Sequence, residues 1–216
     1  MCEKQYNEPE ILSRSAISPI EDLMCEHGIL HRVLLIYAEI VKRLRNGSCC
    51  NYALLYKSVL QTAEITKDFI ENYHQTLEND YIFPLFSESD ETERFQTAIH
   101  TLLIQHQTAL EITDEILRIL ERGVPNHAAR SRLACLMTGY IRMYRPHAAR
   151  EDTYIFPEVR RLVSADRWNE LGEIFEDIEE ERFGKNGFEA MVERVSGIEK
   201  ALGIYELDKF TSKCGL

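Results

Sequence analysis

Two segments of the chain repeat the same arrangement of side chains that can bind a metal. Residues 74–84 read HQTLENDYIFP and residues 147–157 read HAAREDTYIFP, so both follow the pattern H-x3-E-x2-Y-I-F-P. A histidine and a glutamate four residues apart project from the same side of a helix, about one turn apart in height. The repeat therefore predicts two helices that each present one imidazole and one carboxylate in the same direction.

Each of these segments follows a stretch that carries a further histidine on its apolar stripe, His27 in the first half and His106 in the second. The chain therefore reads as two copies of one helical hairpin. Burying four imidazoles and two carboxylates costs several kcal/mol unless they are paired or bound to a cation. We therefore expect a metal site formed by His27, His74, Glu78, His106, His147 and Glu151.

Six such ligands suit two divalent ions, if each ion takes two imidazoles and both carboxylates bridge. Nitrogen and oxygen donors without thiolate, with coordination positions left open, favour iron; manganese is the next choice and structural zinc is less favoured. Two Fe(II) ions would carry four positive charges against two carboxylates. We therefore expect the pair to attract an anionic oxygen bridge, such as oxide or hydroxide.

The periodicity of apolar residues predicts long helices to position these ligands. Ser18, Pro19 and Glu21 provide a start signal, because serine can cap the first free amides, proline suits the first helical position, and glutamate can reach back. Pro146 lies inside the last helix and predicts a kink. The four expected helices run from 19 to about 46, from 52 to 84, from about 91 to 122, and from about 131 to 163.

The expected fold class is therefore all-α, an up-down-up-down four-helix bundle over residues 18–164 with a short helical C-terminal appendage. The appendage, residues 165–216, contains two shorter amphipathic segments, at about 167–183 and 188–202. Residues 1–17 show no clear period and are expected to form an N-terminal arm.

Composition limits the classes of partner. The net charge of −11 and the pI of about 5.2 disfavour binding to nucleic acid and to anionic lipid surfaces. No uncharged apolar run reaches about 18 residues, and the first residues lack the pattern of a secretory signal, so we expect a cytoplasmic protein. The six cysteines form no C-x2-C pair, which argues against a thiolate zinc site.

Four segments, in order, resemble the helices of the hemerythrin-like (HHE cation-binding) family. They are EHGILHRVLLIY, YHQTLENDYIFP, IQHQTALEIT and RPHAAREDTYIFP, and the resemblance covers about residues 18–163. It implies a non-haem di-iron site in a four-helix bundle, carried by the six residues named above.

The sequence departs from the oxygen-carrying members of that family at two positions. Those proteins have H-x3-H on the third helix, whereas Leu110 lies four residues after His106, and they have H-x4-D on the fourth, whereas this chain has H-x3-E. One nitrogen ligand is thus missing, which disfavours reversible oxygen transport. The candidate replacements are His31 and, if the appendage folds over the end of the bundle, Glu179, Glu180 or Glu181.

We favour a metal-binding and gas-binding protein, in which the metal pair engages O2, NO, peroxide or iron itself, for sensing, storage or protection. The alternative is an enzyme whose open coordination position activates O2 or peroxide. A third option is a bundle with a structural metal such as zinc. The sequence leaves the oligomeric state open.

Overall fold

The computed structural model describes residues 18–46, 51–87 and 93–212. Within these ranges every regular element is a helix, which confirms the all-α prediction. The expected N-terminal arm, residues 1–17, lies outside the described residues. No described helix is long and apolar enough to cross a membrane.

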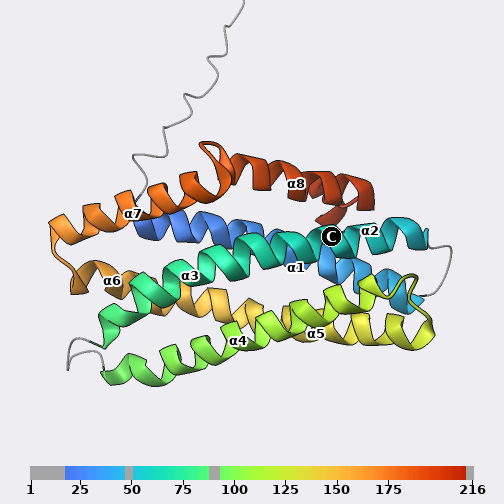
Figure 1. The fold of residues 1–216 in the computed structure, drawn as a ribbon, viewed down its shortest axis with the longest axis horizontal. Coiled ribbons are helices and arrows are strands. Elements are labelled where there is room, and N and C mark those ends of the chain that lie inside the picture. The colour runs from blue at the N-terminus through green and yellow to red at the C-terminus, as the bar shows by residue number, and fades with distance from the viewer. Residues whose placement is uncertain (1–17, 47–50, 88–92, 213–216) are drawn as a thin grey trace, which may run out of the picture.

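Four long helical rods make up most of the molecule (Figure 1). The first is α1 (Pro19–Asn46), and the third is α4 (Glu93–Glu121). The second and fourth rods are each built from consecutive helical segments. The second comprises α2 (Tyr52–Ile65), η2 (Thr66–His74), α3 (Gln75–Leu77), η3 (Glu78–Ile82) and η4 (Phe83–Phe86), and the fourth comprises α5 (His127–Arg150), η6 (Glu151–Ile155) and α6 (Phe156–Leu162).

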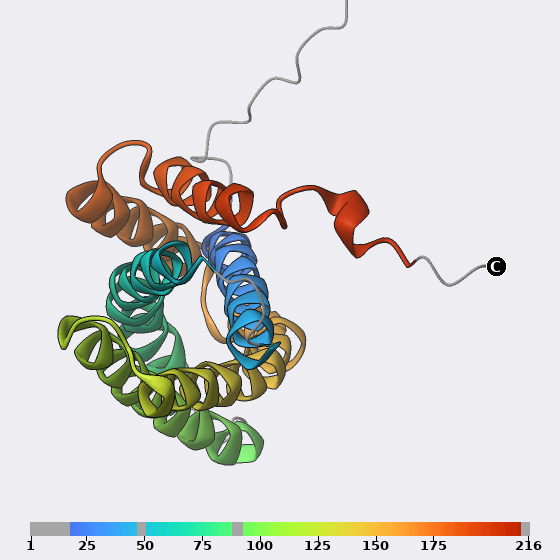
Figure 2. The same cartoon turned by 90° about the vertical axis from the view of Figure 1, so that its right-hand side faces the viewer.

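The rods pack around a common axis. Helix α1 contacts α2 and α5, and α4 contacts the same two helices from the other side. Figure 2 shows this arrangement from one end. Side chains such as Leu23, Leu30, Val59 and Leu133 are completely buried between the rods. This core holds the backbone positions from which the predicted ligands project.

The helix starts follow from local capping. The Ser18 hydroxyl accepts a hydrogen bond from the Glu21 amide at 3.3 Å, and the Glu21 carboxylate accepts one from the Ser18 amide at 3.1 Å, as the start signal predicts. The fourth rod begins at His127 rather than near Ser131, so that expected boundary is wrong. The reason is the cap: the Asn126 side chain accepts a hydrogen bond from the Ala129 amide at 3.0 Å.

The second and fourth rods depart from regular α-helical geometry beside the predicted ligands. Segments Thr66–His74, Glu78–Ile82 and Glu151–Ile155 have the wider π-helical turn. Such turns are rare and frequently occur at functional sites. Helix α5 continues through Pro146. The kink predicted at that proline stays a prediction, and π-helical geometry begins only at Glu151.

The C-terminal segment adds α7 (Ala165–Phe183), α8 (Gly187–Leu202) and η7 (Leu207–Phe210). Helix α7 ends just before Gly184, whose φ of +78° favours glycine. Helix α8 packs on α1 and α2, and α7 contacts α1 and α8. Figure 1 shows both helices along one side of the rods. The division into a bundle and an appendage stays a prediction.

Removal of the Arg32 side chain is expected to loosen α8. Arg32 donates to the Glu199 carboxylate at 2.5 and 3.1 Å and to the Ser196 hydroxyl at 2.7 Å, and Glu199 is only 7% exposed. Arg32→Ala leaves that carboxylate buried without its cation, so we expect a loss of about 1–3 kcal/mol in the free energy of unfolding.

The measurement is urea denaturation followed by circular dichroism. The matched control is Lys42→Ala, because Lys42 is 66% exposed and pairs with Glu39 on the same helix; its loss should stay below about 0.5 kcal/mol. Equal effects of the two substitutions would contradict the account of α8 docking.

Candidate metal centre

The six predicted ligands converge between the four rods. Their donor atoms form two groups, His27 with His74 and Glu78, and His106 with His147 and Glu151; within each group these atoms lie within 4.8 Å of one another. All six residues are buried, with exposed fractions of 3% or less. We call the His27–His74 side position A and the His106–His147 side position B.

Both carboxylates span the two positions. One oxygen of Glu78 lies 3.5 Å from Nε2 of His74, and its other oxygen lies 3.4 Å from Nε2 of His106. One oxygen of Glu151 lies 3.5 Å from Nε2 of His27, and its other oxygen lies 3.1 Å from Nε2 of His147. Each glutamate therefore directs one oxygen to position A and the other to position B.

The same atoms lack conventional hydrogen-bond partners. Both oxygens of Glu78, both oxygens of Glu151, and Nε2 of His27 and of His74 are buried without a hydrogen bond. Such orphaned groups are costly unless something binds them. Their separations of 3.1–3.5 Å are those expected between neighbouring ligands of one ion with bonds of about 2.1 Å. The residues present therefore fit a pair of metal ions.

The other ring nitrogen of each histidine is held by a hydrogen bond. Nδ1 of His27 donates to Asp152 at 2.7 Å, and Nδ1 of His74 donates to Glu26 at 2.7 Å. A hydrogen bond of this kind fixes the ring orientation and leaves Nε2 directed at the centre.

Position B is supported in the same way. Nδ1 of His106 donates to the side-chain oxygen of Asn79 at 2.8 Å, and Nδ1 of His147 donates to that of Gln105 at 2.8 Å. The two Nε2 atoms lie 3.1 Å apart.

Sequence reasoning missed these four acceptors. Each is the immediate sequence neighbour of a predicted ligand but supports a histidine on a different rod, so only the assembled fold reveals the pairing. A polar residue beside each ligand was the available signal. The four acceptors are Glu26, Asn79, Gln105 and Asp152.

Burial makes most of the site neutral in the absence of a cation. Burial and the charge of His27 lower the pKa of His74 well below its ordinary value. Burial and the neighbouring His147 lower the pKa of His106 to about 3. Burial and the charge of Glu151 raise the pKa of Glu78 well above its ordinary value.

His27 and Glu151 are the two groups of the centre that stay charged in the absence of a metal. Burial opposes a charge on His27, but the hydrogen bond to Asp152 and the charges of Glu151 and Glu78 raise the pKa of His27 to about 10. Burial likewise opposes a charge on Glu151, but His147 and His27 lower its pKa below the ordinary value. Without metal, the centre therefore holds a proton on His27.

Aromatic rings cover the histidines. The Phe156 ring stacks on His27, and the Phe83 ring stacks on His106, with centroids 5.5 and 5.7 Å apart. Both phenylalanines come from the repeated Y-I-F-P segments. Tyr144 packs against His147 at 4.9 Å, and its hydroxyl accepts a hydrogen bond from Gln75. These rings give the centre apolar walls.

The candidates for an additional ligand do not join the centre. His31 is exposed and belongs to neither group of donor atoms. Glu180 and Glu181 are exposed as well. Glu179 is buried, but it groups with Asp22 and Glu26, and its carboxylate accepts a hydrogen bond from the Phe188 amide at 2.9 Å. Within the described residues, then, α7 supplies no ligand to either position.

A pocket of about 430 Å³ reaches position B from outside the rods. Its lining includes Gln105 and His147, together with Thr101, Arg94 and Arg150. Of these residues, His147 is a predicted ligand of position B and Gln105 is the side chain that supports it.

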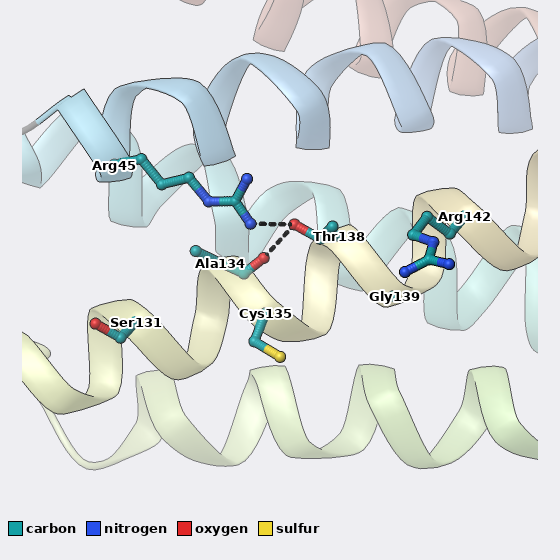
Figure 3. Close-up of a pocket in the computed structure, with 7 residues that line it drawn as sticks. All are labelled: Arg45, Ser131, Ala134, Cys135, Thr138, Gly139 and Arg142. Atoms are coloured by element: carbon teal, nitrogen blue, oxygen red, sulfur yellow. Dashed lines mark hydrogen bonds between the residues drawn. The ribbon is translucent and has the colours of Figure 1, made fainter.

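A second pocket lies between the C-terminal end of α1 and α5 (Figure 3). Arg45, Cys135 and Arg142 are part of its lining, and Arg45 donates a hydrogen bond to the Thr138 hydroxyl at 3.0 Å. None of the six predicted ligands lines it, so it is separate from the candidate centre.

Comparison with known proteins agrees with this geometry. The model of the Hemerythrin HHE cation binding domain matches residues 18–159, a range that includes all six predicted ligands. Proteins described as uncharacterized, from two strains of Mycobacterium tuberculosis and from Mycobacterium bovis, are 42% identical over 192 residues. The aligned region covers 88% of this chain and 72% of each relative. No solved structure matches significantly. The predicted resemblance is confirmed: the chain belongs to the hemerythrin HHE cation-binding family.

Proposed function

We propose that the protein binds two non-haem iron ions between its four rods. Position A would use His27 and His74, position B would use His106 and His147, and Glu78 and Glu151 would bridge the two. The observation that carries this proposal is the orientation of the two glutamates, each with one oxygen toward each position and no hydrogen bond to either oxygen. A single ion would leave half of these donors unused.

The donor set supports iron over other metals. Four imidazoles and two carboxylates, with no thiolate, suit iron, with manganese next. Each position offers four protein donors, two imidazoles and one oxygen from each shared carboxylate, a number that structural zinc also accepts; iron differs in that it readily takes further ligands at open coordination positions. Bound iron would supply the capacity to exchange electrons and to bind O2, NO or peroxide.

We infer that the four rods form an up-down-up-down four-helix bundle with the metals in its core. We infer that this topology, with short connections, brings the two hairpins of the sequence repeat face to face. A cytoplasmic location stays a prediction.

We further propose that the centre serves to bind small oxygen or nitrogen species, or iron itself, for sensing, storage or protection. The pocket beside Gln105 and His147 supports the access of a small molecule to position B. The Phe83 and Phe156 rings cover His106 and His27, whose exposed fractions are only 3% and 1%. The same pocket favours the alternative, an enzyme that turns over O2 or peroxide, so turnover must be measured separately.

Loss of one ligand is expected to abolish the paired site. Protein purified from iron-rich medium should contain about two iron ions per chain, and His74→Ala should contain at most about one, because position A loses one of its two imidazoles. Metal analysis and the visible absorption spectrum measure this. The control is His100→Ala, since His100 is an exposed histidine on α4.

A folded wild-type protein with no bound iron would contradict the proposal. Steady consumption of peroxide or O2 that disappears in His74→Ala would favour the enzyme, whereas a stable ligand complex without turnover supports the binding function.

Metal uptake is expected to release a proton. The pKa of His27 is raised to about 10, so His27 is protonated in the metal-free protein at pH 8, and the incoming ion must displace that proton. Because the pKa of Glu78 is raised as well, uptake releases at least one proton, so between about pH 7 and 9 the apparent affinity should fall at least about tenfold for each unit that the pH falls. Calorimetry in buffers of different ionisation enthalpy counts the protons. Uptake without proton release would contradict the assigned charge of His27.

Blocking the pocket is expected to slow ligand binding. Thr101→Trp places a large side chain in the pocket lining, so NO should bind the iron-loaded protein several-fold more slowly. Stopped-flow absorbance measures the rate. Leu103→Trp is the control, because Leu103 is 40% exposed on the same helix and does not line the pocket. Equal rates in the two variants would exclude this route.

A further inference from the structure

The two positions differ in the charge behind their histidines. At position A both Nδ1 acceptors are carboxylates, Asp152 and Glu26. At position B both are neutral amides, Asn79 and Gln105. The four hydrogen bonds are nearly equal in length, at 2.7–2.8 Å, so the difference lies in charge rather than in geometry.

The sequence repeat makes this contrast systematic. Glu26 and Gln105 occupy equivalent places in the two hairpins, each directly before a stripe histidine. Asn79 and Asp152 also occupy equivalent places, each directly after a bridging glutamate. At both places the halves differ by the exchange of a carboxylate for the amide of the same shape. In the fold, both carboxylates support position A.

The wider surroundings have the same polarity. Glu26, 0% exposed, lies in a group of acidic side chains with Asp22 and Glu179. The pocket at position B contains no acidic residue in its lining, which does include Arg94 and Arg150. Negative charge therefore gathers beside position A, whereas the pocket beyond position B is lined by Arg150 and by Arg94, which pairs with Glu158 at 3.4 Å.

A carboxylate that accepts the Nδ1 hydrogen makes the imidazole a more basic and more electron-donating ligand. The bridging glutamates are shared and cannot favour one ion over the other by charge count. We therefore propose that the two metal positions are inequivalent: position A is the tighter site and fills first, and position B is the weaker, exchangeable site that faces the pocket. This inference rests on the proposed two-metal function.

The test is anaerobic titration of the metal-free full-length chain with Co(II), followed by its visible absorption bands and by calorimetry. The wild type should bind in two steps whose dissociation constants differ by at least about tenfold. Asp152→Asn keeps an acceptor for His27 and removes only the charge. It should weaken the first step by about 10-fold to 100-fold and bring the two steps together.

A substitution in the opposite direction, from amide to carboxylate, distinguishes the effect of charge from the effect of holding the imidazole ring in place. Gln105→Glu adds a carboxylate behind His147 and should tighten the second step. A loss of ring support cannot raise affinity, so a gain at position B depends on charge. The exchange of all four acceptors, Glu26→Gln, Asn79→Asp, Gln105→Glu and Asp152→Asn, keeps the net charge and should reverse which position fills first.

Asp80→Asn is the matched control, because Asp80 is an exposed carboxylate beside Asn79 and is not one of the four Nδ1 acceptors. To identify the first-filled position, His74→Ala should remove the tight step and His147→Ala the weak one. Two equal steps in the wild type, or steps unchanged by Asp152→Asn and Gln105→Glu, would overturn the inference while leaving the two-metal proposal intact. No Co(II) uptake by folded wild type would overturn both.

Discussion

The main physical constraint on this structure is the free-energy cost of burying polar and charged groups that have no hydrogen-bond partner. Four imidazoles and two carboxylates lie between the rods with exposed fractions of 3% or less, and six of their donor atoms have no hydrogen bond. An apolar core of the same shape would not carry that cost. The arrangement suits cations, and the π-helical turns begin at Glu78 and Glu151, the two residues whose carboxylates lie between positions A and B.

Four separate hydrogen bonds hold the histidines, and each of them joins two neighbouring rods. Glu26 on the first rod supports His74 on the second, and Asn79 on the second supports His106 on the third. The other two hydrogen bonds follow the same order around the rods. Gln105 on the third rod supports His147 on the fourth, and Asp152 on the fourth supports His27 on the first. Each rod thus positions a predicted ligand of the next, which couples the geometry of the centre to the packing of the rods.

The sequence was sufficient for most of the helices and for the six side chains that converge, but not for the residues that support them. Helical periodicity, the Ser18 cap and the repeated H-x3-E pattern depend on local spacing, so they could be read directly. The partners of Nδ1 depend on which rods are neighbours and on side-chain rotation, so Asp152 could not be assigned to His27 before the fold was known. The start at His127 was missed because the Asn126 cap precedes the apolar stripe. No sequence rule predicted the π-helical turns.

Anomalous diffraction at the iron edge, from crystals grown anaerobically with iron, would locate bound ions directly. The account predicts two peaks, one between His27 and His74 and one between His106 and His147, with Glu78 and Glu151 bridging them. A single peak, or a peak only at the acidic group of Asp22, Glu26 and Glu179, would contradict it.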